Sequence, residues 1–448
     1  MRHFIISLLV IAVFFTDSAA QDEAVWSLDD CVVYALDNNI SLKRQELNTE
    51  ISKKDFTQSK LNLLPDVGAG VEHTIGDGRV LDLETYRWVN SSVGQGWLGV
   101  QGNLTLFNGL QGFNRIQMSK AAYLLSKSNL VLLENNITLQ VMTGYLDLLR
   151  KKDLLEIAEE KVRVTGLQVN RMERLMEVGN ASSGELLEVK AQHSTEKYNL
   201  INAENSVEIS RLNLVHLLNL EIDTQFDIDK PEIPDPSALD IPNLDSVYAN
   251  SLRYLPQIEG AQHNITMQQK SLAVAKGALS PNIYMRGLYR SNYNNNLLNP
   301  LDPLSPYTLP DQVYDHRFKS VAVGINIPIF NKWQSNTNIS KAKIELQDAR
   351  YNMENEKQLL LQEIQQFYTD AVAALENYHA AGETFANSEE AYRYTEEKFK
   401  VGMATALELE EARNRLFQSQ SEMISAKYVF VFYSKILDFY QGKEINLS

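Results

Sequence analysis

The chain contains a long internal repeat. Residues 98–219 align with residues 321–442 at a constant offset of 223 residues, without a gap. Identical pairs include Phe107 with Phe330, Tyr145 with Tyr368, and Gly179 with Gly402. A second block, residues 36–65, aligns with residues 252–281 at an offset of 216 residues. A duplication of this extent predicts one repeated architecture and not two unrelated domains.

Each unit is predicted to contain a helix, a strand, a loop, a strand, a very long helix, a turn and a returning helix. The first unit is residues 21–222, with strands at about 66–76 and 97–107 and a hairpin tip at about 178–184. The second is residues 243–448, with strands at about 282–293 and 318–330 and a tip at about 401–407. Residues 223–242 form a linker rich in proline and aspartate, which marks the boundary between the units. The two offsets differ by seven residues, because the predicted loop at about 293–317 is longer than its counterpart at about 77–96.

Residues 1–20 have the pattern of a secretory signal peptide. Arg2 precedes an apolar run at residues 4–15, and Ala19 and Ala20 offer a cleavage site. The alternative, a membrane helix, fits less well because the run is shorter than a membrane span. The cysteine at position 31 lies past the expected cleavage site in a helical pattern, and we interpret Cys31 as a small buried apolar residue.

The composition argues against nucleic-acid binding. Acidic residues outnumber basic ones by 57 to 42, and the net charge is −15. A nucleic-acid-binding protein would carry a basic surface, and no cluster of lysine and arginine of that kind occurs in the sequence.

No enzyme signature has the right context, so we predict a protein without catalytic residues, a cofactor or a metal site. Residues 94–99 match the pattern G-x-G-x-x-G, but they lead into a predicted strand. A dinucleotide-binding motif instead leaves a strand and opens a helix. The histidines, including His193, His216 and His263, show no spacing typical of a metal site.

Two predicted helices are unusually long. No proline interrupts residues 112–176 or 335–399, and each stretch would extend roughly 100 Å as a helix. Apolar residues recur at three- and four-residue steps, as in Leu130, Leu133 and Ile137, and this stripe is typical of a helix that packs on other helices. The returning helices match only half of this length. Helices near residues 30–64 and 244–280, stacked end to end with them, would complete it.

The segments between the helices alternate with a period of two. Val321, Val323 and Ile325 are apolar, and the residues between them are small or polar. This length and pattern predict tilted membrane strands, although a half-buried soluble hairpin would alternate in the same way. Four strands cannot close a barrel alone, so a barrel requires several chains. The aromatic residues near the strand ends, Trp97, Tyr289, Tyr293 and Phe318, would suit an interfacial girdle.

The order and duplication of several short motifs resemble the TolC family of outer-membrane efflux and secretion channels. The motifs are the opening segment 26–31, the strand starts at Pro65 and Pro281, and the strand ends at 106–109 and 328–331. The hairpin tips complete the set, and they consist of Val178, Gly179, Asn180, Ala181, Ser182, Val401, Gly402, Met403, Ala404 and Thr405.

The resemblance implies a mostly α-helical protein with membrane β-strands. Three chains would share one β-barrel, continued by a periplasmic coiled-coil tunnel. It implies a homotrimer in the outer membrane of a Gram-negative bacterium, surrounded by outer-membrane lipid. It also implies a periplasmic adaptor protein, which would dock at the tips, and an inner-membrane transporter. Some relatives carry Arg or Tyr near the second tip where this chain has Ala404 and Phe399, so tip closure by that polar network is not expected.

Three glutamates recur just beyond the tips. Glu185, Glu408 and Glu411 would form acidic rings around a periplasmic aperture if three copies surround one axis. The alternative is a solvated first turn, where glutamate favours the helix dipole in any case.

The leading function is a passive exit duct of a tripartite efflux or type I secretion system. The alternative is a periplasmic coiled-coil scaffold or adhesin without a channel. Two membrane-length strand pairs at equivalent places favour the duct, because a scaffold gains nothing from them.

Overall fold

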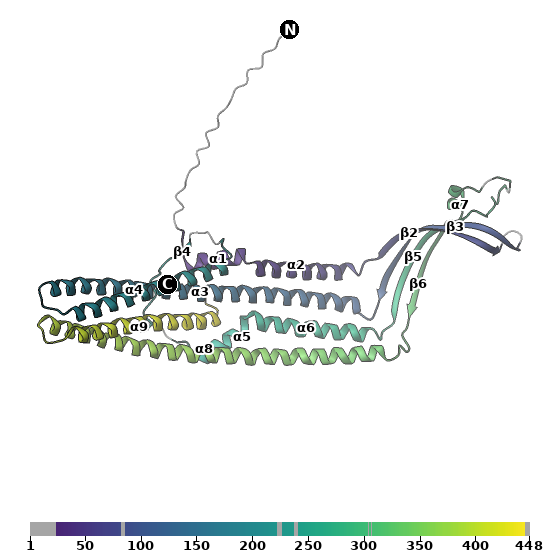
Figure 1. Ribbon diagram of the computed structural model, residues 1–448. Coiled ribbons are helices and arrows are strands. Elements are labelled where there is room, and N and C mark those ends of the chain that lie inside the picture. The colour runs from purple at the N-terminus through teal and green to yellow at the C-terminus, as the bar shows by residue number, and fades with distance from the viewer. Residues whose placement is uncertain are drawn as a thin grey trace, which may run out of the picture. The chain divides into compact units, whose positions relative to one another are not determined.

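The computed structural model describes residues 24–81, 86–221, 226–236, 241–302, 304–305 and 307–443 (Figure 1). The predicted signal peptide and part of the predicted linker lie outside the described residues. In chain order the elements are β1 (Ala24–Trp26), α1 (Leu28–Asn38), α2 (Ile40–Leu61), β2 (Asp66–Leu81), β3 (Trp88–Phe107), α3 (Gln111–Glu177), α4 (Ser183–Leu218), β4 (Phe226–Ile228), α5 (Leu244–Tyr254), α6 (Pro256–Gly277), β5 (Asn282–Asn294), α7 (Leu309–Asp315), β6 (Phe318–Asn326), α8 (Gln334–Lys400) and α9 (Ala406–Tyr440).

The described residues form two compact units that do not follow the sequence repeats. One unit, here called the tip unit, draws on residues up to Ile40, on Glu134–Val247 and on residues from Ile364 onwards. The other, here called the sheet unit, contains Ser41–Leu133 and Tyr248–Glu363. Each unit therefore contains parts of both repeats.

The duplication extends to the bounds of the helices. Helices α3 and α8 each have 67 residues, and both of their ends are separated by the offset of the sequence repeat. The predicted helices near 30–64 and 244–280 are each interrupted once, at Asn39 and at Leu255, which are equivalent positions with extended backbone. Leu255 leaves the helical conformation because Pro256 disfavours it in the preceding residue. Pro256 then occupies the first turn of α6, where its missing N–H group costs nothing.

Four strands form one antiparallel sheet in the order β2-β3-β5-β6. Strands β2 and β3 extend further into the predicted loop 77–96 than we expected, and the last pair in their register is Leu81 with Trp88. Strand β6 ends at Asn326, before the predicted end at 330. Pro328 follows shortly after, and it has no N–H group to donate to a neighbouring strand.

The register gives the sheet two different faces. One face is mainly apolar, and its residues are Val67, Ala69, Val71, His73, Ile75, Gly96, Leu98, Val100, Gly102, Leu104, Ile283, Met285, Gly287, Tyr289, Ser291, Tyr293, Lys319, Val321, Val323 and Ile325. Most of these residues are exposed or half-buried, but Ser291 is buried, and its hydroxyl group donates to the backbone carbonyl oxygen of Val313 in α7. The other face is mainly polar, and it includes Glu72, Thr74, Gln95, Gln101, Asn103, Arg286, Arg290, Asn292 and Ser320. The predicted alternation is thus present in all four strands.

The predicted aromatic girdle is wrong for two of its four residues. Tyr289 and Tyr293 lie on the apolar face, as expected, but Trp97 and Phe318 lie on the polar face. The indole N–H of Trp97 donates a hydrogen bond to the carboxylate of Glu72 across 3.0 Å, which explains its position.

Helices pack closely within the sheet unit. The rings of Phe56 on α2 and Tyr123 on α3 are stacked with their centroids 6.5 Å apart. The turn after β3 passes close to the end of α6. Gly109 in this turn has φ +65°, and a Cβ added to it would lie 2.4 Å from the carbonyl oxygen of Gly277. A side chain at Gly109 would collide with that backbone.

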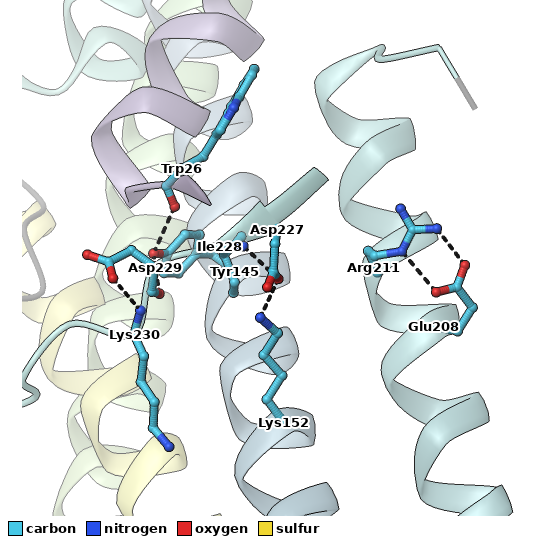
Figure 2. Close-up of polar contacts among 9 residues, drawn as sticks. All are labelled: Trp26, Tyr145, Lys152, Glu208, Arg211, Asp227, Ile228, Asp229 and Lys230. Atoms are coloured by element: carbon cyan, nitrogen blue, oxygen red, sulfur yellow. Dashed lines mark hydrogen bonds and ion pairs between the residues drawn. The ribbon is translucent and has the colours of Figure 1, made fainter. Parts of the chain in front are cut away.

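The tip unit has its core where β1 and β4 pair in parallel, beside α3 (Figure 2). Tyr145 of α3 is fully buried, and its hydroxyl group donates to the carbonyl oxygen of Asp229 at 2.8 Å. The carbonyl oxygen of Trp26 lies 3.3 Å from the same hydroxyl group. Lys152 of α3 forms an ion pair with Asp227. These contacts fix the linker strand β4 and the N-terminal strand β1 to the long helix (Figure 2).

None of the helices in the described part of the chain is both long and apolar enough to cross a membrane.

Candidate functional site

Each long helix ends in the same turn at its hairpin tip. At the first tip the N–H of Gly179 donates to Met176, and the N–H of Asn180 donates to Leu175. Residues Phe399, Gly402, Lys398 and Met403 repeat this pattern at the second tip. This arrangement is the Schellman motif, which requires a residue with positive φ. Both glycines have φ +77°, and a side chain there would strain the backbone.

Each returning helix begins with a capping box. The carboxylate of Glu185 accepts a hydrogen bond from the backbone N–H of Ser182 at 2.7 Å, and the Ser182 hydroxyl accepts one from the N–H of Glu185. Thr405 and Glu408 repeat this exchange with the same 2.7 Å distance. The backbone N–H groups hold the pKa of both carboxyl groups below their usual range. Two of the three predicted ring glutamates therefore also cap their own helices.

The tips expose large apolar side chains. Val178, Val401 and Met403 are each about 70% exposed or more, and Leu187 and Leu407 on the returning helices are also exposed. Clustered exposed apolar residues on a folded protein mark interaction surfaces more often than chance.

A groove of about 280 Å³ lies between the first hairpin and the start of α9. Four carboxylates line it, and its lining residues are Met172, Glu185, Glu188, Val189, Gln192, Thr405, Ala406, Leu407, Glu410, Glu411 and Asn414. A second groove of about 520 Å³ lies between α8 and α9, and both Glu408 and Glu411 line it. The structure thus brings Glu185 and Glu411 to one groove, and Glu408 and Glu411 to another.

A buried arginine in this region was not predicted from the sequence. Arg413 of α9 is almost completely buried, and it forms an ion pair with Glu410 at 3.2 Å. Within the described part of the chain, its Nε and Nη1 atoms have no hydrogen-bond partner. No sequence signal marks this position, because arginine at such a helical position is most often exposed.

The polar face of the sheet carries an ordered cluster. The ring of Trp97 lies over Gly70, where an added Cβ would approach the ring to 2.7 Å. The guanidinium group of Arg290 lies 4.8 Å from the centroid of the Trp97 ring, and its Nε donates to Asn292. Stacking of a cation on an aromatic ring is favourable. The indole ring of Trp97 and the guanidinium group of Arg290 therefore lie against the polar face of the sheet.

The glycine motif at residues 94–99 lies inside β3, which is the wrong context for binding a dinucleotide. Among the described residues, no three His, Cys, Asp or Glu side chains are grouped so that they could hold a metal ion.

The family model for "Outer membrane efflux protein" matches residues 32–220 and 247–431. The chain belongs to this family. The Brucella suis outer membrane efflux protein BepC is 23% identical over 414 residues, which cover 92% of this chain and 84% of BepC. The predicted TolC-family resemblance is confirmed.

Two solved structures share this fold. The outer membrane protein VceC of Vibrio cholerae matches with a TM-score of 0.77 at 15% identity, over 94% of this chain and 97% of that chain. CusC matches with a TM-score of 0.79 at 15% identity, over 93% of this chain and 92% of that chain.

The protein is therefore an outer-membrane channel component of an efflux or secretion system, as predicted. Members of the family serve as the outer-membrane parts of such systems. The alternative of a scaffold or adhesin without a channel has no support in these comparisons.

Proposed function

We propose that three copies of this chain form one passive exit duct, with a shared barrel of about a dozen strands. The sheet supports this proposal, because β2 and β6 are its two outer strands among the described residues. Unpaired strand edges cannot remain open in lipid, so another copy must supply the next strand. A cyclic arrangement joins β6 of one copy to β2 of the next and leaves no free edge.

The two faces of the sheet indicate which face of the proposed barrel is turned to lipid and which to the lumen. The apolar face, with exposed residues such as Val71 and Val321, suits contact with lipid. The polar face, with Arg286, Arg290 and Glu72, suits a lumen filled with water. The inward position of Trp97 agrees with this arrangement, because its N–H group binds Glu72 on the same face.

We propose that the hairpin tips bind a periplasmic adaptor protein, which connects the duct to an inner-membrane transporter. The exposed side chains of Val178, Val401 and Met403 offer an apolar contact area. The groove of about 280 Å³ at the starts of α4 and α9 is lined by four carboxylates, so a basic side chain of the partner would be complementary to it.

We also propose that Glu185, Glu408 and Glu411 of three copies form acidic rings around a periplasmic aperture. Around a three-fold axis these carboxylates would attract cations and repel anions at a narrow aperture. Glu185 and Glu408 belong to the capping boxes of their helices, whereas Glu411 does not. Glu411 lines the groove between α8 and α9 together with Glu408. We also propose that the protein performs no catalysis, and that its role is to provide a path for cargo driven from the inner membrane.

The mass of the detergent-solubilised protein tests the assembly. Native mass spectrometry is expected to give three chains in one particle, stable without an added partner. A particle of one chain that retains native circular dichroism would refute the shared barrel.

A further inference from the structure

The apolar face of the sheet contains a notch made by two paired glycines. Gly102 of β3 and Gly287 of β5 are direct partners in the register, and both belong to the apolar face. A Cβ added at Gly287 would meet no atom within 4 Å, and the nearest atom to one at Gly102 is 3.6 Å away. The apolar face therefore has no side chain at these two neighbouring positions of β3 and β5.

Apolar side chains border this notch. A shallow groove of about 440 Å³ follows it, and its lining consists of Val100, Gly102, Gly287, Leu288, Tyr289, Lys319, Ser320 and Val321. Val100 and Tyr289 lie one step along the strands on the same face, and Val321 is the partner of Gly287 on β6. The width of two strands is about 10 Å, which is enough for a hydrocarbon chain.

A single cation lies at one end of the groove. Lys319 is the partner of Tyr289 in the register, and its Nζ lies 5.6 Å from the centroid of the Tyr289 ring. A lysine that faces lipid costs free energy at the centre of a bilayer, and the cost falls near the headgroups. An anionic headgroup at this height would offset it.

Aromatic residues indicate where the headgroups lie. Tyr293 and His73 are beyond Lys319 on the same face, and they form a hydrogen bond with each other. Their rings are stacked with centroids 5.7 Å apart. Aromatic side chains of this kind form the girdle at the surface of membrane barrels. The glycine notch is therefore on the hydrocarbon side of the girdle, and Lys319, level with Tyr289 in the register, lies between the notch and the girdle.

We propose that this groove binds lipid A, the phosphorylated and acylated anchor of the outer leaflet. One phosphate group would contact the ammonium of Lys319, and one acyl chain would pass Tyr289 into the notch at Gly102 and Gly287. The outer leaflet follows from the place of Lys319 at the start of β6, next to the loop predicted to face the outside. The inference rests on the proposed function, in which the apolar face contacts lipid.

Two substitutions test the two halves of the site. Lys319→Gln removes the cation, and Gly287→Leu fills the notch in a space where no atom interferes. Each variant is purified in detergent, and lipid A and phosphatidylglycerol are measured by native mass spectrometry of the intact particle. We expect the lipid A retained by Lys319→Gln to fall roughly fivefold. Gly287→Leu is expected to lower it as well, with trimer mass unchanged.

The controls lie on the opposite face of the same sheet. Gly68 also has open space around it, and Arg286 is an exposed cation, but both belong to the polar face. Gly68→Leu and Arg286→Gln should retain lipid A at the level of the parent protein. Trimers of both test variants that retain the parent level of lipid A would overturn the proposal, and so would an equal preference for phosphatidylglycerol. A particle that is not trimeric shows instead that the proposed assembly has failed.

Discussion

The hydroxyl group of Tyr145 donates a hydrogen bond to the backbone carbonyl oxygen of Asp229 across 2.8 Å, in the centre of the tip unit (Figure 2). Its partner in the repeat, Tyr368, is only half-buried. The same residue type thus has different surroundings in the two repeats, because the hydroxyl group of Tyr145 bonds to the backbone next to β4.

Replacing Tyr145 by Phe should destabilise the tip unit by about 1–2 kcal/mol, because a buried carbonyl group loses its donor. Tyr368→Phe, the matched change in the second repeat, should cost less than half of that. Thermal denaturation of both variants in the same detergent measures the difference. Equal losses would show that the Tyr145 hydroxyl has no special role.

The helices could be predicted from the sequence because of the duplication. A helix break or cap in one repeat has its equivalent at the matching position of the other repeat. The capping boxes at Ser182 and Thr405 are also readable as the pattern S/T-x-x-E. The break at Asn39 could have been found from Pro256 in the other repeat, but helical periodicity alone does not reveal it.

Other features depend on contacts that a pattern does not contain. The face on which Trp97 lies follows from the register with Glu72 on another strand. The burial of Arg413 depends on tertiary packing around α9, which a helical pattern does not contain. Strands β2 and β3 remain paired as far as Leu81 and Trp88, but apolar and polar residues do not alternate strictly in this outer part of the two strands. The sequence pattern therefore did not indicate the full length of the strands.

A substitution at Gly70 should narrow the barrel. The ring of Trp97 lies over this glycine, so Gly70→Val would push the indole away from the wall. Single-channel conductance should fall if this face lines the lumen. Gly68→Val, on the same face but with no atom within 4 Å, should change conductance less. Unchanged conductance in a trimeric Gly70→Val variant would argue against a lumenal Trp97.

Charge at the tips should control ion selectivity. Glutamine can still accept the capping hydrogen bonds that Glu185 and Glu408 accept, so replacing all three ring glutamates by Gln removes charge while retaining the caps. We expect weaker cation selectivity and weaker block by multivalent cations in single-channel recordings. A correctly assembled triple variant with the selectivity of the parent would reduce these residues to helix caps.

The loop between β5 and β6 should be reachable from outside the cell. Asn295 is unsuitable for an insertion, because its backbone N–H and its side-chain oxygen both bond to Gly94. An epitope tag is better placed after Leu301, which is 93% exposed. Antibody should label intact cells; labelling only after lysis would place this loop on the periplasmic side.

Disulfide cross-linking between the outer strands tests the shared barrel most directly. Cysteines at Gly68 of β2 and at Ser320 or Ala322 of β6 share the polar face. The native Cys31 should not interfere, because it is fully buried and burial raises the pKa of its thiol to about 12. Oxidation of the paired variants in membranes should give covalent dimers and trimers on a denaturing gel, with no larger species. Single-cysteine controls should remain monomeric. A ladder that continues beyond three chains, or no link in any pairing of a correctly folded protein, would contradict closure of the barrel by three copies.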